Sequence, residues 1–178
     1  MSDFNYSNIE TAYDKIKHLL DKTPLISNDY INKLLDAKIY FKLENLQKTG
    51  SFKLRGATYK ISKLSEEQKL NGLVAYSSGN HAQAVAYAAL QNKISAKIIM
   101  PNNAPKIKID NTLKYKAEVI LYDPQKEIRE EIGQAIEKKE KRILIKPYDD
   151  YDIIAGQGTA AYEISKDLEN QSITPDIY

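Results

Sequence analysis

The sequence contains no cysteine, only two histidines and only seven glycines, no two of which are adjacent. The absence of cysteine excludes thiol nucleophiles, thiolate-bound zinc, iron–sulfur clusters and a disulfide framework. The two histidines, His18 and His81, leave little for histidine-based acid–base or metal chemistry, and we expect no metal site. An enzyme built from this chain must therefore use lysine, carboxylate, hydroxyl or a cofactor.

The sequence also lacks a dominant charge and a long hydrophobic run. The 26 basic side chains are scattered among 24 acidic ones, which gives a formal net charge of +2 and argues against a nucleic-acid partner. No apolar stretch approaches the length of a membrane span, and residues 1–5 lack the features of a signal peptide. We expect a cytoplasmic protein without a membrane partner, and 178 residues suffice for one domain or one and a half.

The spacing of apolar residues predicts that strands and helices alternate along the chain. Ser7 and Glu10 have the spacing of a capping box at the start of a helix over 8–20. Further helices are expected at 28–35, from 52, and at 80–91, 105–114, 127–140 and 158–168; strands are expected at 38–44, 73–76, 97–100, 118–122 and 143–146, with a turn into a new strand at 172–178. This alternation favours an α/β fold, in which helices flank a parallel sheet and a ligand binds at the carboxyl ends of the strands.

Residues 47–57 contain the first candidate reactive group. Lys53 follows the aromatic Phe52 and opens a helix in which Gly56 permits close approach of another backbone. A helix N-terminus and partial burial both disfavour the cationic form of an amine, which frees a lysine to attack a carbonyl. The alternative is a surface lysine opposite Arg55, which is the commoner situation for any one lysine.

Residues 76–83, Tyr-Ser-Ser-Gly-Asn-His-Ala-Gln, lie where an expected strand turns into a helix. Such a turn presents unpaired backbone N–H groups with the positive end of the helix dipole behind them. It is therefore a candidate site for a carboxylate or a phosphate. An ordinary capped turn between strand and helix is an equally good interpretation of this segment taken alone.

Four blocks of sequence occur in an order and spacing that carry a resemblance. They are Lys-Leu-Glu-Asn-Leu-Gln-Lys-Thr-Gly-Ser-Phe-Lys-Leu-Arg-Gly-Ala at 42–57, Ser-Ser-Gly-Asn-His-Ala-Gln at 77–83, Met-Pro-Asn-Asn-Ala-Pro-Lys at 100–106 and Ile-Ala-Gly-Gln-Gly-Thr at 154–159. The chain resembles the serine/threonine dehydratases and serine racemases of the tryptophan synthase β-like group of pyridoxal-phosphate enzymes. The resemblance implies that 1–49 begins a large cofactor domain, 50–148 forms a small and nearly complete α/β domain, and 149–178 starts the remainder of the large domain.

The resemblance also implies a role for each matching residue. Lys53 would bind pyridoxal 5'-phosphate covalently and then take the α-proton of the substrate. Phe52 would flank the cofactor ring, and Asn80 would hydrogen-bond the phenolic oxygen of the ring. The substrate carboxylate would be held by the loop of Ser77, Ser78, Gly79, Asn80 and His81.

Ser78 bears on which reaction the resemblance implies. Dehydratases of the family often carry alanine at the matching position, whereas serine racemases carry a serine that acts on the opposite face of the substrate. The implied activity is that of an L-threonine/L-serine dehydratase, an ammonia-lyase that forms a 2-oxo acid and ammonia. The alternatives are a serine racemase-like enzyme, or an inactive fragment or binding module in which Ser78 is only a loop hydroxyl.

A nucleotide effector is a further implication of the resemblance. In serine racemases the residues that match Lys48, Thr49, Gln83 and Tyr115 contact such an effector. All four are present here. Tyr115 fits equally well as an aromatic residue of the core at the end of a helix.

Residues 156–161 also match the Gly-x-Gly-x-x-Ala pattern of a dinucleotide-binding loop, with Asp176 about as far downstream as a ribose-binding carboxylate. The acidic segment 148–152 before them is a poor strand, so we expect this motif to open a helix instead.

Members of the resembled family continue well beyond the point that matches residue 178. Their later segments supply a glycine-rich loop for the cofactor phosphate and the carboxylates of a divalent-metal site. We therefore expect a C-terminally truncated chain with only part of its large domain. The expected partners are L-threonine or L-serine, and either a homo-oligomer partner or a complementing C-terminal polypeptide.

Overall fold

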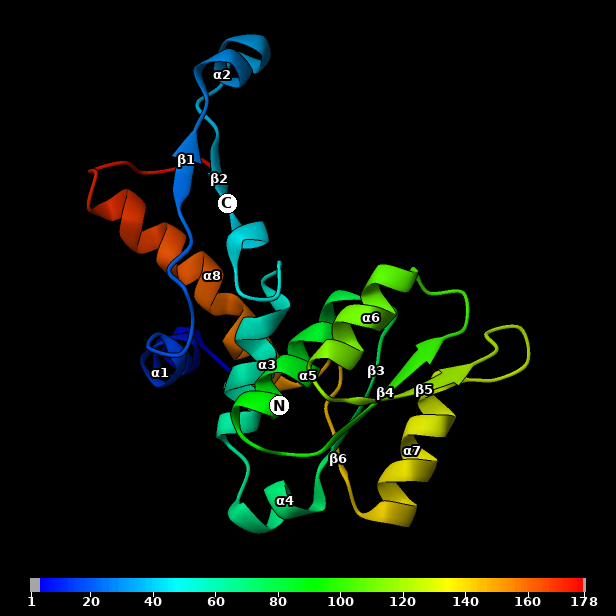
Figure 1. The fold of residues 1–178 in the computed structure, drawn as a ribbon. Coiled ribbons are helices and arrows are strands. Elements are labelled where there is room, and N and C mark those ends of the chain that lie inside the picture. Colours follow the sequence, from blue (N-terminus) through cyan, green and yellow to red (C-terminus); the bar gives the residue numbers. More distant parts are fainter. Residues whose placement is uncertain (1–3, 178) are drawn as a thin grey trace.

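The computed structural model describes residues 4–177, and its centre is a four-stranded parallel sheet. The strands lie in the order β5 (Glu118–Tyr122), β4 (Ala96–Pro101), β3 (Leu73–Tyr76) and β6 (Ile143–Leu144) (Figure 1). Each pairing in this sheet is parallel, so the carboxyl ends of the four strands lie along one edge. The expected α/β fold, a parallel sheet flanked by helices, is confirmed.

Helices cover both faces of this sheet. α5 (Asn80–Gln91) and α6 (Lys106–Lys114) lie on one face, and α7 (Arg129–Glu140) lies on the other. Alternate residues of β3 enter opposite layers: Leu73 and Ala75 join the apolar cluster of α5, while Val74 and Tyr76 pack toward α7. The face of α5 that meets the sheet is rich in alanine and fully buried, so the helix lies close to the strands.

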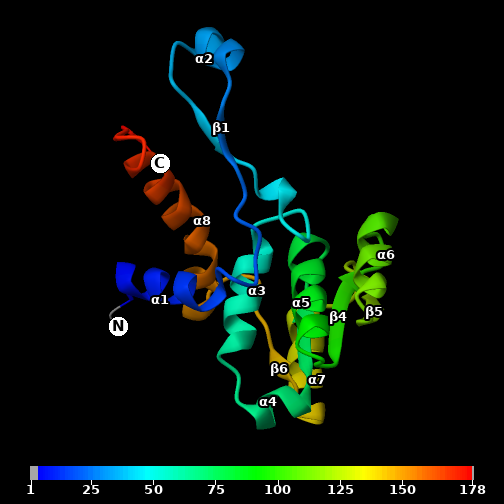
Figure 2. The same cartoon turned by 60° about the vertical axis from the view of Figure 1, so that its left-hand side comes forward.

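Three more helices stack beside α5 (Figure 2). α3 (Lys53–Ser62) packs on α5 and is covered by α8 (Tyr151–Glu169), against which α1 (Tyr6–Ile16) lies; α4 (Glu66–Asn71) leads from α3 to β3. α3 and α8 touch at two glycines, because a Cβ built on Gly156 would lie 2.6 Å from the Cα of Gly56. The close backbone approach expected at Gly56 is therefore made by another helix.

An antiparallel pair of strands extends away from the α/β body in both views (Figures 1 and 2). β1 (Leu25–Ser27) pairs with β2 (Tyr40–Lys42), and α2 (Asp29–Leu35) connects the two. We call residues 25–42 the arm. The short 3-10 helix η1 (Glu44–Leu46) joins the arm to the loop before α3.

A buried network of charges fastens the base of the arm to α3 and α8. Arg55, which is 1% exposed, donates to Glu44 at 2.8 and 2.9 Å and to Glu163 at 2.8 and 3.0 Å. Lys42 Nζ lies 2.7 Å from Glu163, and both side chains are 5% exposed. Burial alone would lower the pKa of Arg55, but its hydrogen bonds to the two carboxylates raise it. Arg55 is therefore a core residue and not the surface neighbour of Lys53.

The first helix differs from its expected bounds and cap. α1 ends at Ile16 rather than at residue 20, and its capping box is made by Asn5 and Asn8, not by Ser7 and Glu10. The Asn5 side chain accepts from the backbone N–H of Ser7, while the Asn8 side chain accepts from that of Asn5. Asparagine caps a helix as well as serine does, so the sequence pattern alone could not choose between the two starts.

The Gly-x-Gly-x-x-Ala motif lies inside α8, which begins at Tyr151 and not at residue 158. The Asp150 side chain caps this helix by accepting from the N–H groups of Asp152 and Ile153. A phosphate-binding loop needs free backbone N–H groups at the turn between strand and helix, and the interior of a helix has none. The dinucleotide interpretation is therefore wrong, and the motif neither forms a loop nor opens the helix.

The other expected elements are present, most of them within two residues of their expected ends, but β1, α4 and the 3-10 helix η1 are not predicted from the sequence. β1 has only three residues, and α4 has no buried residue, so neither shows an apolar period. Residues 172–177 form no strand in the described part of the chain, and Tyr178 lies outside it. Among residues 4–177, the structure contains no helix that is both long and apolar enough to cross a membrane.

Candidate active site

Lys53 is the first residue of α3 and stands at the positive end of that helix. Its Nζ donates to the backbone carbonyl of Pro147 at 3.0 Å and lies 5.4 Å from the centroid of the Phe52 ring. Burial lowers the pKa of the Lys53 amine, and no carboxylate of residues 4–177 forms an ion pair with it. Burial therefore acts against the charged form of this amine, which distinguishes Lys53 from an ordinary surface lysine.

The loop of Ser77, Ser78 and Gly79 leads from the carboxyl end of β3 into α5. The Ser77 hydroxyl accepts from the N–H of Gly79 at 3.2 Å, and no side chain caps the start of α5. A Cβ built on Gly79 would meet no atom within 4 Å, so the loop is open at the Gly79 Cα. The start of α5 therefore has no side-chain cap, and a carboxylate or phosphate site at this turn stays a prediction.

His81 lies in the first turn of α5 and is buried. Its Nε2 lies 3.0 Å from the carbonyl oxygen of Ile145, and its Nδ1 has no partner among the described residues. Burial lowers the pKa of His81 to about 4, and the positive charge of Lys53 acts in the same direction against the Ile145 hydrogen bond. Because a carbonyl can only accept, Nε2 carries the proton of the neutral ring and Nδ1 is left as an unpaired acceptor.

The segment that directly follows β6 brings Lys53 and His81 together. Lys53 binds the carbonyl of Pro147 and His81 binds that of Ile145, two residues earlier. Since β6 pairs in parallel with β3, this segment and the loop after Tyr76 emerge at the same edge of the sheet. The candidate amine and the candidate anion loop thus share one edge, where α/β proteins bind their ligands.

The buried neutral state of His81 predicts a pH dependence of stability. The folded-state pKa of about 4 lies below the value of about 6.5 for an unfolded chain. The stabilisation from a neutral His81 is therefore complete above pH 6.5 and is lost as the pH falls toward 4, by about 1.4 kcal/mol per pH unit. We expect the free energy of unfolding, measured with urea between pH 6.5 and 5, to fall with this slope. Carboxylates titrate below this range. His81→Gln should remove the slope. A slope that is equal in both proteins would contradict a buried neutral His81.

Two cations at this edge were not expected from the sequence. Lys108 of α6 donates from Nζ to the Asn80 side-chain oxygen at 2.9 Å, and Arg129 of α7 lies 5.4 Å from the centroid of the Tyr76 ring. Each lies in the first turn of a helix that follows a strand of the sheet, and this spacing from β4 and β5 is the signal that would have indicated them. Asn80 itself is exposed at the start of α5.

The expected effector residues Gln83 and Tyr115 lie between α5 and α6. The Gln83 side-chain oxygen accepts from Asn111 at 3.0 Å, while its Nε2 is buried without a partner. Tyr115 packs edge-on against Tyr87 with 5.2 Å between ring centroids, which agrees with the alternative that Tyr115 is an aromatic residue of the core.

Lys48 and Thr49 make different contacts. Lys48 donates from Nζ to the carbonyl of Leu19 at 2.9 Å, and the Thr49 hydroxyl is buried without a partner. No hydrogen bond or ion pair among residues 4–177 links either residue to Gln83 or Tyr115. A nucleotide effector at these four residues stays a prediction.

The fold and the site together define a parallel α/β protein that presents a partly buried amine beside an uncapped helix N-terminus. A neutral amine reacts with an aldehyde, and an uncapped helix N-terminus binds a carboxylate. The residues present therefore fit a cofactor that carries an aldehyde, with a carboxylate-bearing substrate next to it.

Comparison with known proteins identifies this class more closely. Residues 16–177 match the family described as pyridoxal-phosphate dependent enzyme, and the chain belongs to that family, whose cofactor is pyridoxal phosphate. The chain is 44% identical over 163 residues to L-threo-3-hydroxyaspartate ammonia-lyase of Saccharomyces cerevisiae, covering 92% of this chain and 50% of that protein. It is also 44% identical over 172 residues to the biosynthetic L-threonine dehydratase of Lactococcus lactis, covering 94% and 41%.

Solved structures show the same fold. The crystal structure of serine racemase from Dictyostelium discoideum matches with a TM-score of 0.85 and 40% identity, over 92% of this chain and 53% of that chain. The fold is therefore that of the fold-type II pyridoxal-phosphate enzymes. The chain spans about half the length of the relatives that it matches.

Proposed function

We propose that this chain carries the lysine-bearing half of the site of a pyridoxal-phosphate-dependent ammonia-lyase that acts on L-threonine or L-serine. The observation that carries the proposal is the convergence of Lys53 and His81 on the segment after β6. This convergence holds a partly buried amine beside the uncapped start of α5. A dehydratase and a hydroxyaspartate ammonia-lyase among the relatives support a lyase of a 3-hydroxy amino acid.

Each residue of the site has a task in the proposed reaction. The Lys53 amine, whose pKa is lowered by burial, would hold the cofactor through its aldehyde carbon and would later accept the proton from the substrate α-carbon. When bound, pyridoxal phosphate supplies an electron sink for the charge that remains on that carbon. Phe52 would flank the ring of the cofactor, and Asn80 would bind its phenolic oxygen. The β-hydroxyl would then leave as water with the proton that Lys53 took up, and addition of one water molecule would release ammonia and a 2-oxo acid.

The loop after β3 positions the substrate in this proposal. The backbone N–H groups of Ser78, Asn80 and His81 would bind the α-carboxylate, as an uncapped helix N-terminus does, because those of Ser77 and Gly79 already donate to the Ile99 carbonyl and to the Ser77 hydroxyl. The neutral His81 ring adds no charge there, so the helix dipole and N–H groups provide the attraction.

The domain boundaries implied by the resemblance are part of the proposal. Residues 50–148 would form the small domain, because they contain all four strands of the parallel sheet. Residues 1–49 and 149–178 would belong to the large domain, in support of which α1 and the base of the arm both contact α8.

A serine racemase-like activity is the second candidate. Ser78 is exposed at the candidate anion loop, and its hydroxyl makes no hydrogen bond to another residue of the described chain. A hydroxyl that is free in this position is available to exchange a proton with the opposite face of the substrate α-carbon. This observation favours racemisation as the competitor of elimination.

Covalent labelling tests the proposed site. The purified chain is incubated with pyridoxal phosphate, reduced with borohydride, digested and analysed by mass spectrometry. We expect label at Lys53 to exceed that at exposed lysines at least tenfold, because burial lowers the pKa of the Lys53 amine and so enlarges its nucleophilic fraction. Lys53→Ala should lose this label, and the matched control Lys63→Ala should keep it. Equal labelling of Lys53 and the exposed lysines would refute the assignment.

Product assays on the same protein rank the candidate reactions. L-threonine, L-serine and L-threo-3-hydroxyaspartate are supplied separately, and 2-oxo acid and D-serine are measured. A 2-oxo acid supports the lyase, and D-serine that disappears in Ser78→Ala supports the racemase. Label at Lys53 without any product would favour the binding module.

A further inference from the structure

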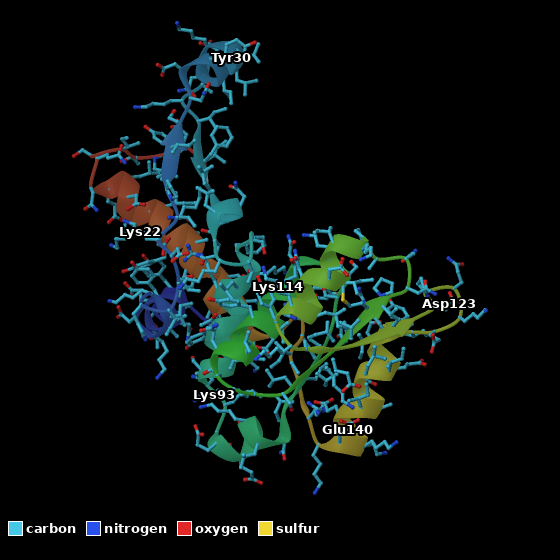
Figure 3. The ribbon with its side chains drawn as sticks, in the orientation of Figure 1. Lys22, Tyr30, Lys93, Lys114, Asp123 and Glu140 are labelled. Carbon is cyan, nitrogen blue, oxygen red and sulfur yellow. The ribbon has the colours of Figure 1, made fainter. Side chains whose placement is uncertain are left out.

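α5 and α6 meet along a seam of three side-chain contacts. Each contact joins two residues that are 28 apart in the sequence, and the three are Asn80 with Lys108, Gln83 with Asn111 and Tyr87 with Tyr115. Because residues three or four apart lie on one face of a helix, the seam follows one face of α5 and runs along α6, whose last residue, Lys114, is labelled in Figure 3. The constant spacing fixes the register of the two helices. The contact of Lys108 with Asn80 is therefore the first step of an aligned interface and not an isolated surface contact.

The seam begins at the candidate anion loop. Asn80 is the first residue of α5, whose start has no side-chain cap, and Lys108 lies in the first turn of α6. Lys108 is half-buried and pairs with no carboxylate among residues 4–177, whereas its neighbour Lys106 forms an ion pair with Asp110. The amine of Lys108 is thus committed to the Asn80 side chain.

The chemistry of lysine sets the direction of the Asn80 amide. A lysine ammonium has three donors and no acceptor, so the Asn80 amide must turn its oxygen toward Lys108 Nζ, which lies 2.9 Å away. The amide nitrogen then keeps both of its N–H groups, and it makes no hydrogen bond among residues 4–177. Without Lys108, the amide could rotate by half a turn about its last side-chain bond and present its oxygen in place of its nitrogen.

We propose that Lys108 is a positioning residue, which holds the Asn80 amide so that its nitrogen donates to the phenolic oxygen of pyridoxal phosphate. This inference rests on the proposed function, in which Asn80 binds that oxygen. An N–H donor favours the deprotonated form of the phenolic oxygen, whereas an amide oxygen in the same place would favour the protonated form. The ammonium holds the amide more firmly than water would, because charge-assisted hydrogen bonds are about twice as strong as neutral ones.

NMR of the chain without cofactor tests the direction of the amide. The carbon of the Asn80 side-chain carbonyl reports which donor binds its oxygen. We expect Lys108→Met to shift this carbon signal upfield, because the cationic donor is lost, and Lys108→Arg to keep it near its original place. The matched control is Lys106→Met in the same turn of α6, where the side chain is 87% exposed, and it should leave the signal unchanged. Circular dichroism checks that each variant is folded. An Asn80 signal that is the same in the unaltered chain and in Lys108→Met would overturn the proposal.

Absorbance spectra after incubation with pyridoxal phosphate test the consequence for the cofactor, whose deprotonated phenolic form absorbs at longer wavelength than the protonated form. We expect Lys108→Met to lower the ratio of deprotonated to protonated form about tenfold, the effect of one lost hydrogen bond to a charged group. Lys108→Arg should restore the ratio, and Lys106→Met should not change it.

Borohydride labelling of the same samples separates this proposal from the proposed function. The label at Lys53 should persist in every variant, because the Lys53 amine binds the carbonyl of Pro147 and not Lys108. An unchanged spectrum in a labelled Lys108→Met chain would overturn the positioning role and leave the proposed function intact. Absence of the label from the unaltered chain would instead refute the proposed function, and the NMR signal of Asn80 would still decide the direction of its amide.

Discussion

Replacing Glu163 by alanine is expected to lower the free energy of unfolding by about 3–5 kcal/mol. The Glu163 carboxylate binds Arg55 through two hydrogen bonds and lies 2.7 Å from Lys42 Nζ. The side chains of Lys42 and Arg55 are almost fully buried. Removal of the Glu163 carboxylate therefore leaves two buried positive charges, and Glu44 is the carboxylate that remains bonded to Arg55. Urea denaturation at pH 7 measures this loss, provided that the unfolding free energy depends on urea concentration with the same slope in both proteins.

A control on the same helix separates burial from charge. Glu169 pairs with Lys166 at the exposed end of α8, with side chains 58% and 46% exposed. Glu169→Ala should change stability by no more than about 0.5 kcal/mol, because solvent screens this pair. Added salt should weaken that small effect and leave the Glu163 effect in place. A loss of less than about 1 kcal/mol in Glu163→Ala would show that water reaches the network.

Gly156→Ala is expected to destabilise the protein by about 3 kcal/mol, the upper end of the usual range for overpacking. The added Cβ would lie 2.6 Å from the Gly56 Cα and 2.8 Å from the Arg55 carbonyl oxygen. Both are backbone atoms of α3, so relief requires α3 and α8 to move apart. Alanine also gains about 1 kcal/mol of helix propensity over glycine, so a net loss shows that the packing effect dominates.

Gly158→Ala is the matched control for this crossing, measured by thermal unfolding alongside Gly156→Ala. It lies on the same helix and gains the same propensity, but its Cβ would meet the Ile9 side chain at 2.9 Å. A side chain of α1 can change rotamer, whereas a helix backbone cannot, so we expect a change within about 1 kcal/mol. If Gly156→Ala proved as stable as Gly158→Ala, the helices would not cross as closely as described.

The sequence predicts the sheet and its covering helices because their patterns are local. Buried β3 reads as a short apolar run, and the small residues of α5 repeat at helical spacing. It misplaces the start of α8, because the acidic residues before Ile153 look like a turn although Asp150 is a helix cap. The sequence does not predict α4, because this helix is polar and has no apolar face.

The candidate site is predicted in part. Lys53 and the loop into α5 follow from residue type and position, since a lysine at a helix start and a serine–glycine turn after a strand have local signatures. The signature of Lys108 beside Asn80 is weak, because it consists of a position in the first turn of a helix after a strand, where a lysine is usually solvated. The unpaired Nδ1 of His81 is likewise invisible until its surroundings are known.

By itself, the sequence determined the α/β alternation and, through its motif blocks, the family, and it indicated Lys53 and the loop into α5 as candidate site residues. Only the tertiary structure decided that Arg55 is a core residue, that Gly156 serves a helix crossing, and that Lys53 and His81 meet at one segment. The reason is the range of the interactions. Periodicity and capping act within a few residues, whereas Arg55 and Glu163 are 108 residues apart and become partners only when α3 packs on α8.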